Sequence, residues 1–119
     1  MAPEVVFPLL GIVFVALAWP LAARRVPPNR WYGLRVPATF ADETVWYDAN
    51  AAAGRDMMAF GTVATVIALV LPHVARLPSE MYAGVCAGVF GLGSLILALR
   101  GWRQANRLLR QRRGGGDAV

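Results

Sequence analysis

Several residue types with distinctive chemistry are scarce or absent in this sequence. Cys86 is the only cysteine and His73 the only histidine, so the chain can form no disulfide within itself and cannot supply the Cys/His cluster of a zinc site. There is no lysine, which excludes lysine Schiff-base chemistry. A length of 119 residues leaves room for one domain and excludes a large enzyme with separate cofactor and substrate domains. We therefore expect no metal, no cofactor and no enzymatic activity.

Charged residues are also scarce. They make up 16% of the chain, against about 25% in soluble domains, whereas 57% of the residues are hydrophobic. Three stretches, residues 5–23, 57–75 and 81–99, contain no Asp, Glu or Arg, and each is just long enough to cross a bilayer core as a helix. The sequence therefore predicts an all-α integral membrane bundle of three transmembrane helices. The absence of mid-span charges argues against an autonomous pump or channel.

The arginines are distributed unevenly. Eleven of the twelve lie in the loop 24–56 or in the segment 100–113, and Arg76 alone lies in the turn between the second and third spans. The positive-inside rule predicts a multi-pass membrane protein with its N-terminus outside and its loop and C-terminus in the cytoplasm. Because these arginines adjoin membrane ends, we expect them to meet anionic lipid headgroups of the bilayer, and we expect no nucleic acid.

The remaining boundaries follow from the same pattern. Residues 1–113 are predicted to form a single membrane domain, in which residues 100–113 continue the third span as a basic juxtamembrane helix. Residues 114–119 are predicted to be a disordered tail. Small residues in the third span suit close helix packing, either within the bundle, which we favour, or with a second copy in a homo-oligomer. The candidate packing residues are Gly84, Gly88 and Gly91.

The loop 24–56 is longer than a connection between two helices requires, and long loops are often functional. Its first half mixes aromatic, glycine and arginine residues. The run from Thr39 to Asp42 matches a capping box. We expect it to open an amphipathic helix that ends near Ala53, stops at Gly54, and lies along the cytoplasmic surface or against the bundle.

Several residues of this loop together resemble a known family. The motif consists of Pro28-Asn29, Tyr32-Gly33, Arg35, Pro37, Glu43-Thr44-Val45-Trp46, Asn50 and Gly54. It resembles the SdpI family of small bacterial membrane proteins, which includes immunity proteins against secreted peptide toxins. The resemblance covers about residues 5–100, and its specific part is residues 28–54. One departure is Val36, where family members commonly have threonine. The resemblance implies that the loop binds a partner through Asn29, Tyr32, Gly33, Arg35, Pro37, Trp46, Asn50 and Gly54.

The same residues also fit a structural latch. In that case Arg35 would pair with Asp42, Asp48 or Asp56, and Asn50 would bind polar groups of the loop backbone. Both interpretations can hold together, because a latched loop can present a binding site.

Three functions remain open at this point. The first is binding and neutralisation of a membrane-active peptide toxin without catalysis, as in toxin immunity. The second is a signalling sensor or scaffold that holds a cytoplasmic regulator through its basic face. The third, which we favour least, is a small transporter subunit or a lipid-acting enzyme, because acids in a first helical turn usually interact with the helix dipole.

Overall fold

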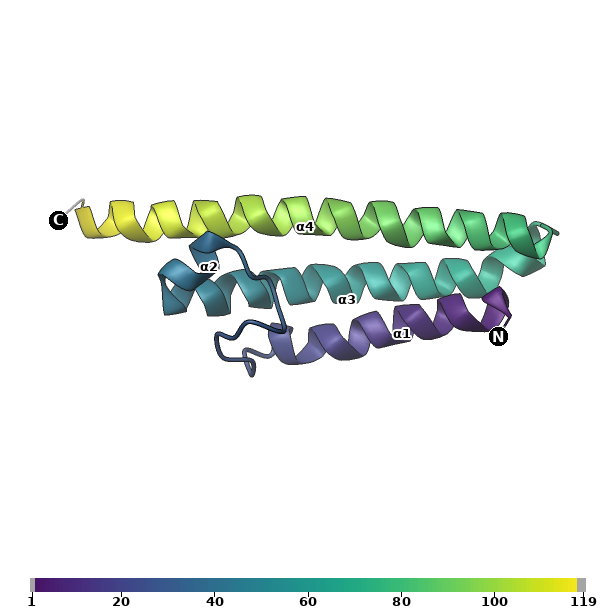
Figure 1. The fold of residues 1–119 in the computed structure, drawn as a ribbon, viewed down its shortest axis with the longest axis horizontal. Helices are drawn as coiled ribbons and strands as arrows, with labels where there is room; N and C mark the ends of the chain where they lie inside the picture. Colours follow the sequence, from purple (N-terminus) through teal and green to yellow (C-terminus); the bar gives the residue numbers. More distant parts are fainter. Residues whose placement is uncertain (1, 118–119) are drawn as a thin grey trace.

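The computed structural model describes residues 2–117, which form four helices and no strand (Figure 1). The helices are α1 (Pro3–Ala22), α2 (Pro37–Ala41), α3 (Glu43–Val74) and α4 (Ser79–Asp117). Three of them, α1, α3 and α4, are long and apolar enough to cross a membrane. They lie side by side in a rod of 61 × 21 × 20 Å, in which α3 packs against both of the others. This confirms the predicted all-α bundle with three spans.

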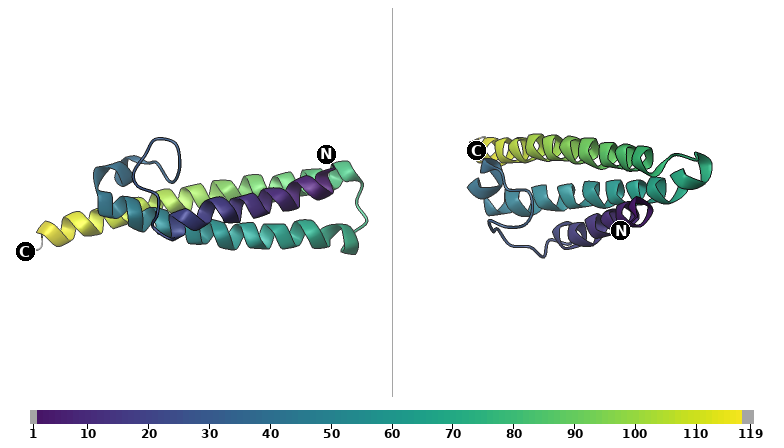
Figure 2. Two further views of the ribbon diagram at one scale, coloured as in Figure 1. Left: turned by 90° about the horizontal axis from the view of Figure 1, so that it is seen from below. Right: turned by 45° about the vertical axis from the view of Figure 1, so that its right-hand side comes forward.

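Helix length places the loop and the arginines at one end of the rod. Helix α1 has 20 residues and is about 30 Å long, which matches a bilayer core. Helices α3 and α4 have 32 and 39 residues, or about 48 and 58 Å. Their extra turns extend past the C-terminal end of α1, where the loop and α2 also lie, and α4 projects furthest (Figure 2). We call this the basic end. The N-terminus and the α3–α4 turn lie at the opposite end.

The helix predicted inside the loop has a different start and end. Asp42, not Thr39, caps α3: its carboxylate accepts hydrogen bonds from the backbone N–H groups of Thr44 (2.8 Å) and Val45 (3.3 Å). The Thr39 hydroxyl instead closes the first turn of α2 by bonding the backbone of Val36. Helix α3 continues through Gly54 to Val74 without a break. The prediction of a separate helix that stops at Gly54 is therefore wrong.

Gly54 is required for packing and does not end the helix. A Cβ atom at this position would lie 2.6 Å from the backbone nitrogen of Ala22 and 2.9 Å from the carbonyl oxygen of Ala18. A Cβ at Gly61 would lie 3.0 Å from the carbonyl oxygen of Gly11. The two glycines, seven residues apart on one face of α3, let the backbone of α1 approach closely.

The three glycines of α4 that were predicted to pack closely do not face the inside of the bundle. A Cβ atom at Gly84, Gly88 or Gly91 would have no neighbour within 4 Å. The internal contact that we favoured for them is therefore wrong. Helix α4 turns Tyr82, Cys86 and Phe90 inward instead, at four-residue spacing, and these residues are buried. Because large side chains take the inner face, the three glycines fall on the outer face, and their contact with a second copy remains a prediction.

Two clusters hold the ends of the rod. At the basic end, Ala38 of α2, Ala49 of α3 and Ala105 of α4 pack together with surrounding leucines. At the other end, Tyr82 packs against Ala68 and donates a hydrogen bond of 2.7 Å to its carbonyl oxygen.

The six residues predicted to form a disordered tail are divided: residues 114–117 belong to α4, and residues 118–119 lie outside the described part of the chain.

Candidate functional site

The loop begins at a tightly closed end of α1. The N–H of Arg25 bonds the carbonyl of Pro20 (2.9 Å) and the N–H of Arg24 bonds that of Leu21 (3.1 Å), the pair of bonds that forms a Schellman motif. Arg24 occupies the left-handed position with a φ of 60°, where glycine is usual. Its guanidinium lies 2.6 Å from the carboxylate of Asp48 on α3. The chain therefore leaves α1 in a fixed direction and turns towards α3.

Asn29 forms the next turn. Its side-chain oxygen accepts hydrogen bonds from the N–H groups of Trp31 (2.8 Å) and Tyr32 (2.7 Å), and its amide donates to the carbonyl of Pro27 (2.8 Å). Asparagine suits this position because its short side chain can satisfy backbone groups two and three residues ahead. The side chain predicted to contact a partner is thus used to shape the loop.

Asn50 and Trp46 of α3 fasten the loop to the bundle. The Asn50 side-chain oxygen accepts a hydrogen bond of 2.5 Å from the N–H of Leu34, and its amide donates to the carbonyl groups of Leu34 (3.4 Å) and Trp46 (3.0 Å). The Trp46 indole donates a bond of 2.8 Å to the carbonyl of Val26. Both side chains are buried. We call Val26, Leu34, Trp46 and Asn50, together with Gly33, the latch.

Gly33 completes the latch because no other residue fits there without strain. Its φ is +109°, a conformation that residues with a side chain rarely adopt. A Cβ atom would also lie 2.8 Å from the side-chain oxygen of Asn50. Three of the predicted site residues, Gly33, Trp46 and Asn50, are therefore brought together. The prediction that Asn50 binds polar groups of the loop backbone is confirmed by its hydrogen bonds to Leu34.

The predicted pairing of Arg35 with an acidic residue is wrong. The three candidate acids are each bound to another arginine: Asp42 to Arg112 at 2.6 Å, Asp48 to Arg24 at 2.6 Å, and Asp56 to Arg100 at 2.9 Å. These pairs join α3 to α4 twice and to the end of α1 once. The spacing of the sequence could not identify them, because Asp42 and Arg112 are separated by 70 residues.

Arg35 is left at the surface. Its guanidinium donates a hydrogen bond to the carbonyl of Arg30 within the same loop. Nearby in sequence, Trp31 is 87% exposed. Phe40 of α2 is half exposed, and its ring lies 5.6 Å from that of Trp46. We call Trp31, Arg35 and Phe40 the loop surface. Trp31 and Phe40 are not among the residues predicted from the sequence to form the site. Their aromatic character in a polar loop is the signal that could have identified them.

Tyr32 and Pro37, the two other predicted site residues of this loop, are close in sequence to Trp31 and Arg35. The Tyr32 hydroxyl is buried and has no hydrogen-bond partner within the described residues, and burial raises the pKa of Tyr32. Pro37 is the first residue of α2, where the missing N–H of proline costs nothing.

Within residues 2–117, no three His, Cys, Asp or Glu side chains are arranged to hold a metal ion. The loop surface offers an indole, a phenyl ring and a guanidinium group. These groups can contact apolar and anionic parts of another molecule.

Comparison with known proteins gives one match. The sequence model of the SdpI/YfhL protein family matches residues 25–101, more than half of the chain. No curated protein and no solved structure matches the chain. The matched range contains the whole latch, α2 and α3, and it ends at Gly101, where a Cβ atom would touch the Leu34 side chain. It excludes α1.

Proposed function

This chain belongs to the SdpI/YfhL protein family, and we propose that it protects a bacterial plasma membrane against a membrane-active peptide by binding that peptide without catalysis. The family match carries the proposal, since the motif resembles that of immunity proteins in this family. The three apolar helices agree with a multi-pass membrane protein. The positive-inside rule supports a cytoplasmic position for the basic end.

The loop surface supplies groups that suit a peptide of mixed polarity. The indole of Trp31 favours the membrane interface, where an amphipathic ring contacts both lipid and water. The guanidinium of Arg35 offers a planar pair of donors to a carboxylate, such as the C-terminus of a peptide. The latch fixes the backbone between α1 and α3, so little ordering of the loop is needed on binding. A peptide would be intercepted at the inner surface of the bilayer, after it has entered.

A protection experiment tests this proposal. Cells that express the chain are challenged with peptide-containing supernatants of related strains, and survival is compared for wild type, Arg35→Ala and Trp31→Ala. The control is Arg76→Ala, which removes an exposed arginine at the opposite end of the bundle. Equal membrane levels are confirmed first. We expect wild type and Arg76→Ala to protect and the two loop variants to lose protection.

Two outcomes contradict the proposal. If wild type protects against no peptide, the immunity function is wrong. If all variants protect equally, the loop surface does not recognise the peptide, and the motif is a latch alone.

A further inference from the structure

One exposed side of α4 carries a line of arginines beyond the apolar span. Arg100, Arg103, Arg107 and Arg110 follow one another at intervals of three or four residues, which places them on one side of the helix. They lie opposite Gly101 and Ala105, which are buried against the rest of the bundle. The line rises about 15 Å along the axis. The line of arginines therefore faces solvent and the membrane surface and does not face the latch.

This line is short of negative charge. Arg100 is paired with Asp56 at 2.9 Å. None of the ion pairs found within residues 2–117 includes Arg103, Arg107 or Arg110. Like charges at three- and four-residue spacing repel one another on a helix surface. An anion that sits among these guanidinium groups would relieve that repulsion and accept charge-assisted hydrogen bonds.

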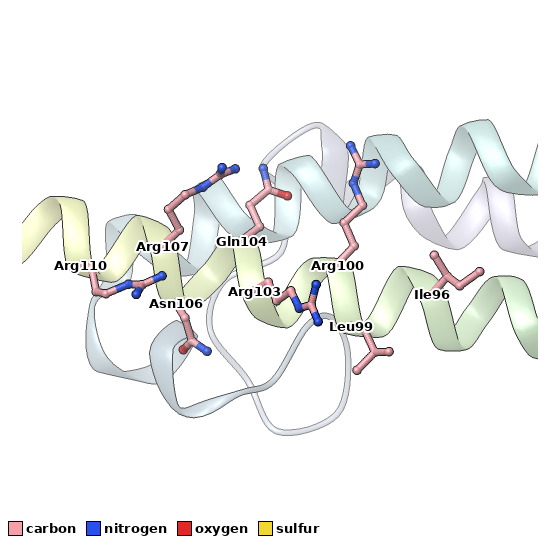
Figure 3. Close-up of a pocket in the computed structure, with 8 residues that line it drawn as sticks. All are labelled: Ile96, Leu99, Arg100, Arg103, Gln104, Asn106, Arg107 and Arg110. Carbon is pink, nitrogen blue, oxygen red and sulfur yellow. The ribbon is translucent and has the colours of Figure 1, made fainter.

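The same face becomes apolar towards the centre of the bundle. Ile96 and Leu99 precede the arginines and are 63% and 44% exposed. Together with the arginines they line a groove of about 660 Å³, and all of its labelled side chains come from α4 (Figure 3). An occupant with an apolar part beside Ile96 and Leu99 and an anionic part beside the arginines would complement this groove.

Depth in the membrane indicates which molecule has that character. The apolar span ends at Leu99, and a headgroup layer extends roughly 5–8 Å past the hydrocarbon core. Arg103 lies about 6 Å beyond Leu99 along the helix axis, at the level of lipid phosphates. Arg107 lies about 12 Å beyond it, and its long side chain can reach back towards the phosphates. An acyl chain of a lipid in the same leaflet would lie along Ile96 and Leu99.

We propose that this face of α4 is a binding site for one anionic phospholipid. The phosphate lies between Arg100, Arg103 and Arg107, and an acyl chain covers Ile96 and Leu99. Charge complementarity and the change from apolar to basic side chains at the membrane surface carry the assignment. The site is separate from the loop surface, so it stands or falls independently of the proposed immunity function.

Lipid retention measured by native mass spectrometry tests this site. The purified chain is released from micelles that contain phosphatidylglycerol, cardiolipin or phosphatidylcholine. We expect one phosphatidylglycerol or cardiolipin molecule to remain bound, and phosphatidylcholine to dissociate. In Arg103→Gln/Arg107→Gln we expect retention about 30-fold weaker, since each arginine near a membrane surface contributes about 1 kcal/mol to binding anionic lipid.

The matched control is Arg30→Gln/Arg55→Gln, which removes the same charge from exposed side chains outside the groove. We expect the retention of anionic lipid to change less than about threefold, because these side chains do not touch the phosphate. Circular dichroism checks that all variants keep their helix content.

Three results would overturn the assignment. The first is equal loss in both double variants, which would mean that the basic end attracts lipid only through its total charge. The second is equal retention of phosphatidylcholine, which would remove the role of charge. The third is displacement of the lipid by millimolar inorganic phosphate, which would mean that the groove takes a free anion and the acyl chain contributes nothing.

Discussion

At the scale of single residues, Gly33 keeps the loop closed for two reasons. Its positive φ excludes an unstrained side chain, and the space beside its Cα is occupied by the side-chain oxygen of Asn50. Either effect alone would oppose substitution of Gly33, and here the two act together.

We therefore expect Gly33→Ala to lower the free energy of unfolding by about 1–3 kcal/mol, the range for strained backbone. Thermal unfolding in detergent micelles, followed by circular dichroism, measures the change. Gly88→Ala is the control, because a Cβ there meets no atom within 4 Å. Equal melting temperatures for the two variants would contradict the role assigned to Gly33.

The carboxylate of Asp42 forms an ion pair with Arg112 of α4. Its pKa is lowered from the ordinary value, first because Arg112 donates a hydrogen bond to its carboxylate, while partial desolvation opposes this and the N–H groups of Val45 and Thr44 assist. A folded-state pKa below the unfolded one means that the unfolded chain binds the proton more tightly. The stabilisation from this pair is therefore complete above the unfolded pKa and is lost as the pH falls through the lower, folded value.

A carboxyl titration by NMR between pH 2 and 6 measures this directly. We expect the midpoint of Asp42 to lie below the unperturbed value of about 3.9, and to rise towards it in Arg112→Gln. We also expect amide exchange of the last turns of α4 to quicken as the Asp42 carboxylate becomes protonated. An unchanged midpoint in Arg112→Gln would show that the pair does not form in solution.

At the scale of the helices, the contact between α1 and α3 depends on space for two backbones. Gly54 faces backbone atoms of Ala18 and Ala22, which cannot rotate away as a side chain can. A larger residue must therefore push the helices apart along their contact. This also explains why α1 is held against α3 although no buried ion pair joins them among the described residues.

We expect Gly54→Val to destabilise the bundle by about 1–3 kcal/mol, as overpacking of a close contact usually does. Unfolding by titration of a denaturing detergent measures the loss. Gly91→Val is the matched control, since the outer face of α4 has room for the side chain. If both valines had the same effect, helix propensity and not the α1 contact would explain it.

At the scale of the whole molecule, the fold gathers its positive charge at one end. The loop after α1 and the last turns of α4 lie side by side there, while Arg76 lies in the turn at the opposite end. A charge difference of this size between the ends sets the direction in which a bundle inserts. We predict that the basic end faces the cytoplasm.

Cysteine labelling of intact cells measures the orientation. Cys86 is buried and is first replaced by alanine. A membrane-impermeant maleimide is then expected to label Arg76→Cys on intact cells, and to label Arg30→Cys and Arg107→Cys only after the membrane is opened. The reverse pattern would place the loop outside and overturn both the orientation and the proposed route of peptide interception.

Much of the site could be named from the sequence without knowing what its residues do. The sequence identifies the motif from Pro28 to Gly54 as a unit, and it predicts the hydrogen bonds of Asn50 to the loop backbone. The sequence does not predict the partner of Arg35 correctly, because the acids that it was expected to bind are held by arginines from distant parts of the chain. The exposed Trp31 and Phe40 were missed because the packing of a loop decides which aromatic rings it leaves outside.

The sequence by itself determined the three spans and the difference in charge between their two ends. The free energy of transferring an apolar segment into a membrane is a sum over the residues of that segment, so a local stretch of sequence contains it. Only the tertiary structure decided that α3 runs through Gly54, that the α4 glycines face outward, and that Asp42 binds Arg112. Each of these depends on which face a helix turns towards its neighbours. The orientation of each helix depends on the free energy of all the contacts in the bundle together. It therefore cannot be predicted from one local segment of the sequence.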